Sequence, residues 1–480
     1  MTGRGHTRDG GEGGRRGGER GPARTVQPAR RVAFDVLRAV SDADAYANLL
    51  LPSAIAAAGL GPQDSALATE LTYGTLRRRG TYDAIIADAA GRPVAQIDPS
   101  VLDALRLGAH QLLATRVAPH AAVNESVNLV ALAQGRGAAS FANAVLRRIS
   151  RDAAAQWQTR IESGARSDDE RLALRSAHPV WIIRALRRAL AAEGRADELD
   201  ALLEADNASP EVTLAALPGL AERGEPRRPY APTAFGSPGG DPHAVVAASG
   251  GLIRVQDEGS QLVALALAES APIAAGERWL DLCAGPGGKT ALLAAIAHDN
   301  GVAVEANEVV PARAGLVRNA LRPVPGDVPV HEEDGREFAR RHQGTFTRVL
   351  VDAPCTGLGA LRRRPEARWR KTAADVAELV PLQTELLDAA IDALAPGGIV
   401  AYVTCSPHLA ETSGVVQDVL RRRDDVAELD AIAVLRRVSS SPIDLAGDGP
   451  GHAQLWPHRH GTDAMFLALL QKGGGSPGAR

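Results

Sequence analysis

The segment from Leu280 to Thr290, LDLCAGPGGKT, decides the fold of its half of the chain. Its apolar residues predict a strand, its glycines predict a tight turn, and the continuation TALLAAIA predicts a helix. A strand that passes through a glycine-rich turn into a helix is typical of sheets that bind nucleotides. The segment therefore predicts an α/β domain and raises the question of which ligand the turn holds.

Two common phosphate-binding motifs do not fit this turn. The P-loop motif needs a glycine five positions before Gly288, where this chain has Cys283. The dinucleotide motif GxGxxG fails as well, because Thr290 occupies the position of its third glycine. Binding of ATP or NAD through a pyrophosphate is therefore a minor alternative.

From about Gly251 onward, short apolar segments alternate with helical patterns. The predicted strands are RWLDLCA, VAVEANE, VPVHEED, RVLVDAP, GIVAYVTCS and AMFLALLQ. This alternation predicts a largely parallel, doubly wound, Rossmann-like sheet. Ligands of such sheets bind beyond the carboxyl ends of the strands, so candidate site residues are those that follow a strand.

Carboxylates at three of these strands fit an adenosyl group that lacks a pyrophosphate. Glu308 ends the second strand, where its oxygens can accept hydrogen bonds from ribose hydroxyls. Asp334 ends the third strand and is expected to meet the adenine edge. Asp281 in the first strand is expected to orient the turn or to face the amino group of the ligand. S-adenosylmethionine needs these contacts. Each carboxylate alone could be an ordinary capping or loop residue, but the ordered set is much harder to explain in that way.

Two of the three cysteines lie where neighbouring strands end. VDAPCTGLG places Cys355 after one strand, and YVTCSPH places Cys405 after the next. Both thiols are expected in one crevice, and their spacing alone does not show which of them reacts. Three cysteines cannot form a disulfide framework, which favours a reducing compartment.

The composition is that of a soluble globular protein with two or three domains. The 480 residues are 45% hydrophobic and 23% charged, and a net charge of −3 does not by itself indicate a nucleic-acid binder. No apolar run approaches the ~20 residues that cross a bilayer, and we see no secretory signal and no zinc-ligand spacing. We expect a cytoplasmic monomer without a membrane partner or a metal.

The rest of the chain divides into tails, a helical region and a connector. Patterns such as ARRVAFDVLRAV place apolar residues on one helical face, and a Pro/Gly-rich stretch from Pro226 to Pro242 predicts a loop. The predicted units are 1–28 and 473–480 as disordered tails, 29–150 as an all-α domain, 151–250 as an α/β connector, and 251–472 as the doubly wound domain.

Together these motifs resemble the RsmB/Sun branch of the RNA cytosine-5 methyltransferases. The matching segments are VQDEGSQLVA, LCAGPGGKT, VDAPCTGLGALRRRPEARWR and VTCSPHLAE. ANLLL, ELTYGTLRRRGTYD, LRLGAHQLL, APHAAVNESVNLV and FANAVLRRI look like the NusB-like RNA-binding domain of this branch. The resemblance covers about residues 29 to 472. It implies methylation of carbon 5 of a cytosine in 16S rRNA, named in this branch as cytosine 967.

The resemblance implies S-adenosylmethionine as the cofactor. Its implied contacts are Cys283, Ala284, Gly285, Pro286, Gly287, Gly288, Lys289, Glu308, Arg313, Asp334 and Asp352. For the side chain of Cys283 we favour packing. The turn departs from the family pattern, because Gly285 stands where an alanine is usual, and Asp463 to Phe466 reads DAMF instead of DGFF.

The resemblance also assigns roles to the two thiols. RNA enzymes of this kind attack carbon 6 of cytosine with the TCS cysteine, here Cys405, while the DAPC cysteine, Cys355, assists product release. Asp352 is the carboxylic acid expected at ring nitrogen 3. DNA cytosine-5 methyltransferases attack from a Pro-Cys motif, so the opposite assignment is the rival hypothesis.

For several charged residues the sequence is consistent with two different roles. RRRPEARWR, Arg362 to Arg370, is predicted to clamp RNA phosphates beside a base held out of its stack, or else to be a solvated loop. Lys289 is expected near the methionine carboxylate or Asp352, and Arg313 is expected to brace Glu308 or the RNA backbone. The clusters Arg77–Arg79 and Arg147–Arg151 suit phosphates or a solvated face, and His408 and Glu411 suit the nucleophile or a helix start.

Two other functions remain open. The same chemistry on tRNA or 23S rRNA is the first, although the NusB-like segments favour 16S rRNA as the partner. A non-catalytic RNA-binding or antitermination factor is the second. Intact Asp352, Cys355 and Cys405 argue against it, because a binding relic need not retain them.

Overall fold

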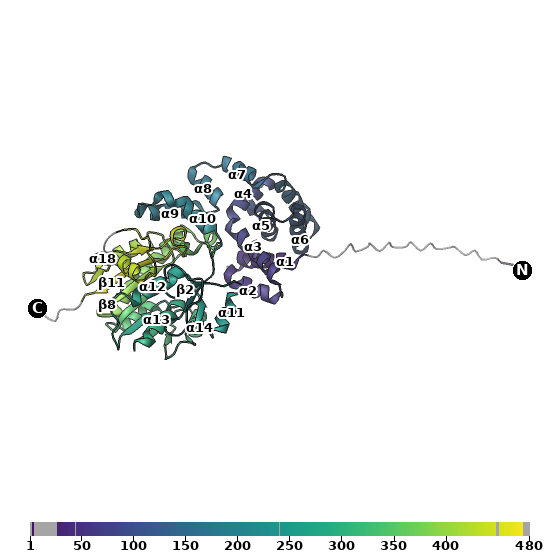
Figure 1. The fold of residues 1–480 in the computed structure, drawn as a ribbon. Helices are drawn as coiled ribbons and strands as arrows, with labels where there is room; N and C mark the ends of the chain where they lie inside the picture. Colours follow the sequence, from purple (N-terminus) through teal and green to yellow (C-terminus); the bar gives the residue numbers. More distant parts are fainter. Residues whose placement is uncertain (1, 4–25, 44, 240, 448–450, 474–480) are drawn as a thin grey trace.

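The computed structural model describes residues 2–3, 26–43, 45–239, 241–447 and 451–473. The disordered tails predicted for 1–28 and 473–480 lie largely outside these residues. A helical lobe, purple to blue in Figure 1, lies beside a green-to-yellow lobe that contains the large sheet. Among the described residues, no helix is both long and apolar enough to cross a membrane.

The helical lobe confirms the predicted all-α domain. Its helices are α1 (Pro28–Asp42), α2 (Ala47–Ala57), α3 (Pro62–Arg77), α4 (Arg79–Ala90), α5 (Pro99–Ala114) and α6 (Pro119–Ile149), with a 3₁₀ turn at Val94–Gln96. Proline stands at the first turn of α1, α3, α5 and α6, where a missing N–H costs nothing. The apolar faces enclose one core around α5, which is buried over most of its length.

The connector adds a series of helices and a small sheet. The helices are α7 (Ala154–Ser163), α8 (Asp168–Ser176), α9 (Val180–Ala192) and α10 (Leu199–Asn207), preceded by a 3₁₀ turn at Ala196–Glu198. Strands β1 (Thr213–Ala216), β2 (Ala234–Gly236) and β3 (Ile253–Val255) pair antiparallel in the order β2-β1-β3, and α11 spans Pro242–Ala248.

One prediction for the connector is wrong. The stretch from Pro226 to Pro242 was expected to be loop throughout, yet it contains β2. Ala234 and Phe235 are buried and pair with Ala215 and Leu214 of β1. Pairing with a strand some twenty residues away stabilises β2, and local composition carries no signal of that partner.

The large sheet confirms the predicted doubly wound fold and all six predicted strands. They are β4 (Arg278–Asp281), β5 (Ala303–Asn307), β6 (Val330–His331), β7 (Phe346–Asp352), β8 (Leu394–Thr404) and β11 (Phe466–Lys472), joined by β9 (Val426–Glu428) and β10 (Ala453–Gln454). The order is β10-β11-β8-β7-β4-β5-β6, with β9 also on β11. Strands β8, β7, β4, β5 and β6 are parallel, and β11 is antiparallel to β8.

Helices cover both faces of this sheet. Helices α12 (Glu258–Ala268), α13 (Gly288–Asp299), α14 (Pro311–Leu321) and α19 (Ala431–Val438) contribute to one core, which Trp279 of β4 enters. Helices α15 (Gly335–Arg341), α17 (Ala373–Ala393) and α18 (Ser413–Arg422) contribute to the core on the other face, which Leu280 enters. Neighbouring residues of one strand therefore serve opposite faces, as a pleated strand requires. Short helices α16 (Ala367–Arg370) and α20 (Pro457–His460) and a 3₁₀ turn at Leu358–Ala360 lie in the loops.

Arg368 joins the two lobes. Its side chain is fully buried, and its guanidinium donates hydrogen bonds to the carbonyls of Arg77 (2.9 Å) and Asp206 (2.7 Å) and to Asn207 Oδ1 (2.7 Å). Arg77 ends α3, Asp206 and Asn207 end α10, and the carbonyl of Ala177, just after α8, lies at 3.5 Å. Helix carboxyl ends carry partial negative charge, so this cation serves three helices at once. Burial lowers its pKa to about 10.

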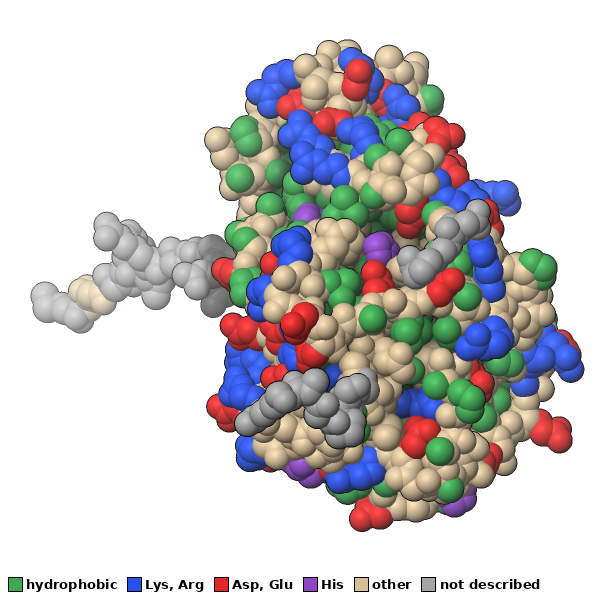
Figure 2. All heavy atoms as spheres, turned by 90° about the vertical axis from the view of Figure 1, so that its left-hand side faces the viewer, with side chains coloured by type: hydrophobic (Ala, Val, Ile, Leu, Met, Phe, Trp, Pro, Cys, Tyr) green, Lys and Arg blue, Asp and Glu red, His purple; other side chains and the backbone are tan. Residues whose placement is uncertain are grey.

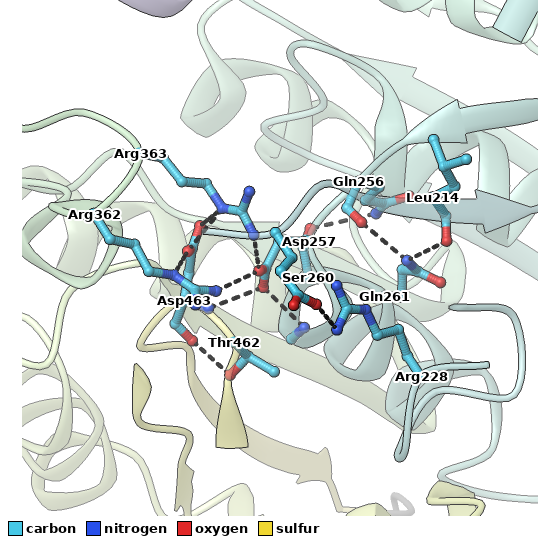
Figure 3. A network of polar contacts seen from close by, with 12 residues as sticks. Leu214, Arg228, Gln256, Asp257, Ser260, Gln261, Arg362, Arg363, Thr462 and Asp463 are labelled. Atoms are coloured by element: carbon cyan, nitrogen blue, oxygen red, sulfur yellow. Dashed lines mark hydrogen bonds and ion pairs between the residues drawn. The ribbon is translucent and has the colours of Figure 1, made fainter. Parts of the chain in front are cut away.

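The other arginines of the segment 362–370 also face the protein, with one exception. Arg362 and Arg363 pair with Asp257 and Asp463 (Figure 3). Arg370 donates to two carbonyls of the helical lobe, Val40 and Ala45, each at 2.6 Å. Both predictions for this segment, a phosphate clamp and a solvated loop, are wrong for the arginines so engaged, because their donors are used within the protein. Arg364 alone of the five is exposed.

The surface mixes charges of both signs. On the face in Figure 2, basic and acidic side chains are interspersed among apolar ones. The exposed members of the predicted basic clusters are Arg78, Arg147, Arg148 and Arg151, while Arg77 is buried and Arg79 is half-buried beside Asp83. On this face, an RNA-binding site would therefore have to use particular side chains and not one broad positive field.

Candidate active site

The two predicted thiols meet beyond the carboxyl ends of β7 and β8. These strands are parallel neighbours, with Asp352 of β7 opposite Val403 of β8. Cys355 and Cys405 follow a few residues later, and their Sγ atoms lie 3.4 Å apart, within hydrogen-bond distance. The sequence placed both at strand ends, and the adjacency of the strands brings them into contact.

The environment makes the two thiols unequal. The hydrogen bond from Cys355 lowers the pKa of the Cys405 thiol, and the positive charges of Arg364 and Lys289 act in the same direction. The same hydrogen bond and burial raise the pKa of Cys355 well above its ordinary value. The charges of Arg364 and Lys289 favour Cys405 as the thiolate of the pair, and the Cys355 S–H would then be the donor of the hydrogen bond between the two sulfurs. A thiolate is the nucleophilic form of cysteine.

One buried carboxylate fixes both cysteine segments. Glu411 accepts hydrogen bonds from the backbone N–H (2.8 Å) and hydroxyl (2.5 Å) of Thr356 and from the hydroxyl of Ser406 (2.6 Å). Thr356 follows Cys355 and Ser406 follows Cys405, so the spacing of the thiols depends on this carboxylate. Of the two roles open to Glu411, the structure favours the first, which is to position the nucleophile segment. The fourth donor to Glu411 is the side-chain amide of Gln383 in α17, at 3.2 Å. Nothing in the sequence indicates this contact, because glutamine is common within helices.

Gly359 closes the same region from the other side. Its N–H donates to the carbonyl of Cys405 (2.8 Å), and its own carbonyl accepts from the N–H of Ala464 (2.8 Å). A Cβ at this position would overlap the Ala464 carbonyl, so only glycine allows the approach. The DAMF segment that departs from the family pattern is thus in backbone contact with the thiol loop.

Lys289 lies beside Asp352 and so takes one of its two predicted positions. Its ammonium is 2.7 Å from Asp352 Oδ2. Burial alone would lower the pKa of Lys289, but the Asp352 carboxylate outweighs burial and raises it. The pair connects the start of α13, after the glycine-rich turn, with the end of β7 next to the thiols.

Glu308 and Arg313 hold the glycine-rich turn. Glu308 accepts hydrogen bonds from the N–H groups of Gly285 and Val310, both at 3.0 Å. Arg313 donates to the Gly285 carbonyl at 2.6 Å and lies 3.5 Å from Glu308, so it braces Glu308 as one of its two interpretations predicted. A Cβ at position 285 would meet the Glu308 carboxylate, so an alanine here would require the Glu308 side chain to shift.

The remaining turn residues connect β4 to α13. Ala284 is buried and Pro286 is exposed. Gly287 has a φ of 101°, a conformation that favours glycine, and Gly288 starts the helix. Cys283 packs against the core on the α15–α17 face, as favoured from sequence, and burial raises its pKa far above the ordinary range.

The two other predicted carboxylates differ in environment. Asp281 is buried, and its Oδ2 accepts from the Thr290 hydroxyl (2.7 Å), while its Oδ1 has no hydrogen-bond partner among the described residues. Burial raises the pKa of Asp281 to about 7. Asp334 caps α15 through the N–H of Arg336 (2.9 Å), and the Arg336 side chain lowers the pKa of Asp334 to about 2. Asp281 therefore has a buried oxygen left for a ligand.

Comparison with known proteins agrees with this geometry. The family model "16S rRNA methyltransferase RsmB/F" matches residues 270–471, and the NusB family model matches residues 27–151. The ribosomal RNA small subunit methyltransferase B of Pseudomonas syringae pv. tomato is 32% identical over 465 residues, covering 92% of this chain and 96% of the relative. The chain belongs to the RsmB/Sun family. A Mycobacterium tuberculosis protein named as a methyltransferase is 50% identical over 462 residues, covering 94% of this RsmB/Sun chain and 98% of the relative.

The RsmB/Sun fold also matches a solved structure. The crystal structure of PH0851 superposes with a TM-score of 0.78 at 23% identity, and the match covers 93% of this chain and 99% of the other. The family models and the curated relatives confirm the resemblance inferred from the motifs, and this structural match confirms the predicted fold class. The described part of this RsmB/Sun protein holds no group of three or more His, Cys, Asp or Glu side chains suited to a metal ion.

Proposed function

We propose that this protein transfers a methyl group from S-adenosylmethionine to carbon 5 of a cytosine in 16S rRNA, through a covalent bond to Cys405. The observation that carries the proposal is the thiol pair: two sulfurs 3.4 Å apart whose pKa values are shifted in opposite directions. Membership of the RsmB/Sun family supports the RNA substrate, and the names of the relatives support 16S rRNA.

The donor site fits S-adenosylmethionine in two respects. The buried Asp281 Oδ1 lacks a partner among the described residues, which suits the ammonium group of the donor, and Glu308 and Arg313 hold the glycine-rich turn at the strand end where a ligand of this fold binds. The residues proposed to hold it are Asp281, Cys283, Ala284, Gly285, Pro286, Gly287, Gly288, Lys289, Glu308, Arg313, Asp334 and Asp352. When bound, S-adenosylmethionine supplies an electrophilic methyl group on its sulfonium sulfur.

Cys405 activates the base. Carbon 5 of cytosine is a poor nucleophile, and addition of the Cys405 thiolate to carbon 6 makes carbon 5 electron-rich. We assign Asp352 to the proton at ring nitrogen 3: its carboxylate takes up a proton from solvent when the base binds, gives it to nitrogen 3 as the sulfur adds and takes it back as the sulfur leaves. The Lys289 ammonium, 2.7 Å away, stabilises the carboxylate that remains.

Cys355 completes the cycle. Once the Cys405 sulfur is bonded to carbon 6, it no longer carries the negative charge that raises the pKa of Cys355. Cys355 then loses its proton to solvent more easily, and its thiolate can accept the proton on carbon 5. The electrons of that C–H bond re-form the ring double bond, and the Cys405 thiolate leaves. This order of reaction steps favours attack by Cys405 over the rival assignment, in which Cys355 attacks the base.

The same proposal covers the substrate and the organisation of the chain. A NusB-like domain over 29–150, a connector over 151–250 and a methyltransferase domain over 251–472 would bind and methylate the RNA as one monomer. An rRNA substrate agrees with the cytoplasmic location expected from sequence. The same chemistry on tRNA or 23S rRNA is the alternative that the test must separate.

The test is methyl transfer from labelled S-adenosylmethionine to 16S rRNA, 23S rRNA and tRNA. Wild type, Cys405→Ala and Cys355→Ala are compared, and protein–RNA adducts are sought on a denaturing gel. We expect no methylation and no adduct for Cys405→Ala, and an accumulated adduct for Cys355→Ala on 16S rRNA. An adduct in Cys405→Ala would instead assign the attack to Cys355, and labelling of no RNA would refute the proposed activity.

A further inference from the structure

Arg364 differs from the other arginines of the segment that follows Cys355. Arg362, Arg363, Arg368 and Arg370 donate hydrogen bonds to carboxylates or carbonyls of the protein. Arg364 is exposed, and among the described residues its guanidinium has no hydrogen-bond or ion-pair partner. Its neighbours in sequence therefore anchor the segment, and its own donors remain for another molecule.

The position of Arg364 relates it to the nucleophile. The Arg364 N–H donates to the carbonyl of Ala360 (2.9 Å), and the N–H of Gly359 donates to the carbonyl of Cys405 (2.8 Å). Arg364 therefore stands one turn of chain from the residue that is bonded to the Cys405 backbone. Its charge is among those that act on the Cys405 thiol.

The side chain that meets Arg364 comes from the helical lobe. Tyr46, just before α2, is 41% exposed, and the Arg364 guanidinium lies 5.5 Å from the centre of its ring. Arg370 lies 5.4 Å from the same ring, and Glu366 accepts a hydrogen bond from the Ala47 N–H (3.1 Å). An exposed aromatic ring of the helical lobe is thus held against the segment that follows Cys355. Helix α2, which begins one residue after Tyr46, lies on the side of the helical lobe that faces the sheet lobe (Figure 1).

We infer that Tyr46 and Arg364 form a binding subsite for the RNA nucleotide next to the target cytosine. The inference rests on the proposed function, because a base that reaches Cys405 must leave its stack and its neighbours then need support. Arg364 offers charged donors to the phosphate, and the exposed surface of the Tyr46 ring, beside the two guanidinium groups, offers aromatic area against which the adjacent base can pack. Sites that bind single-stranded RNA commonly combine basic side chains, which contact the backbone, with aromatic rings on which bases stack.

The subsite gives the helical lobe a direct part in the reaction centre. The ring comes from the residue before α2, and the guanidinium comes from the loop that follows β7. Neither lobe holds the complete site. The interactions of Arg368 and Arg370 with the helical lobe keep the two halves in register.

The test compares Tyr46→Ala and Arg364→Ala with the conservative variants Tyr46→Phe and Arg364→Lys. Leu49→Ala, an exposed neighbour of Tyr46, and Arg166→Ala, an exposed arginine of the connector, are matched controls. Each is measured for methyl transfer against RNA concentration and for the Kd of a fluorescent RNA oligonucleotide that contains the target. Thermal unfolding and donor binding of each variant are checked first.

We expect Tyr46→Ala and Arg364→Ala to raise the KM and Kd for RNA roughly 5- to 100-fold, the range for loss of one base–aromatic stack, with donor binding unchanged. Tyr46→Phe keeps the face and stays near wild type, Arg364→Lys is intermediate, and both controls behave as wild type. An oligonucleotide with an abasic site beside the target should bind wild type weakly and should lose nothing further with Tyr46→Ala, because the stack is already absent.

Two results would overturn the subsite. The first is wild-type RNA binding by both alanine variants, and the second is an abasic penalty that is the same in Tyr46→Ala as in wild type. If wild type methylates RNA and either result is found, the subsite alone fails. If wild type methylates no RNA, the proposed function fails, and the comparison of Kd values still decides whether Tyr46 and Arg364 contact RNA.

Discussion

Replacing Arg368 with methionine tests whether one buried guanidinium holds the two lobes together. Methionine fills similar space but gives up four hydrogen bonds, three to the backbone carbonyls of Arg77, Ala177 and Asp206 and one to the Asn207 side chain. Each carbonyl left buried without a donor costs about 1–3 kcal/mol. The substitution also removes the cost of burying a charge, which offsets part of the loss. We expect a net destabilisation of about 3–5 kcal/mol, comparable with breaking a buried pair.

The assay is thermal unfolding combined with limited proteolysis. A loss of that size lowers the first unfolding transition by roughly 10 °C, at about 2–4 °C per kcal/mol for a unit of this size. New cleavage is expected at the junction between α3 and α10, because the ends of these helices lose their shared donor. Arg364→Met, an exposed arginine of the same segment, is the matched control and should change stability by no more than about 0.5 kcal/mol. An Arg368→Met protein that unfolds within about 1 kcal/mol of wild type would refute the reasoning.

Three further predictions concern the site. Glu411→Gln should lower kcat by about 100-fold and leave donor affinity intact, since an amide cannot accept from all the donors that position the thiols; wild-type kcat in single-turnover assays would contradict this. The pKa of Asp281 is raised to about 7, so its protonated form predominates below that pH, and calorimetry should show tighter donor binding as the pH rises from 6 to 8. Asp281→Asn should remove that pH dependence, and a slope that persists would exclude Asp281. Deleting residues 29–149 should weaken RNA binding and spare donor binding, because the contacts of the turn lie within the sheet lobe; loss of donor binding would show that the division of the chain is wrong.

The parts of the structure that could be predicted from the sequence are those that depend on residues close together along the chain. The strands of the large sheet and the turn after β4 follow from short apolar runs and glycines, and the two thiols follow from strand ends. Arg368 was misjudged because its partners lie about 160 and 290 residues away along the chain. The sequence of a segment with several arginines is the same whether its guanidinium groups bind RNA phosphates or donate hydrogen bonds to the carboxyl ends of helices. Glu411 was singled out by its nearness to Cys405, but its bonds to Thr356 could be seen only in the fold.

The two ends of the large sheet bear on how the protein behaves at high concentration. One side of the sheet ends in β6, which has two residues, and the other side ends along β11 in the short strands β9 and β10, which have three and two residues. A long, flat edge offers a row of unpaired N–H and C=O groups to which another chain can add a strand, and short edges are one way in which proteins avoid such aggregation. Few unpaired backbone groups are therefore available at either side of this sheet for a strand of another copy. The parallel strands between those edges are thus protected from edge-to-edge aggregation.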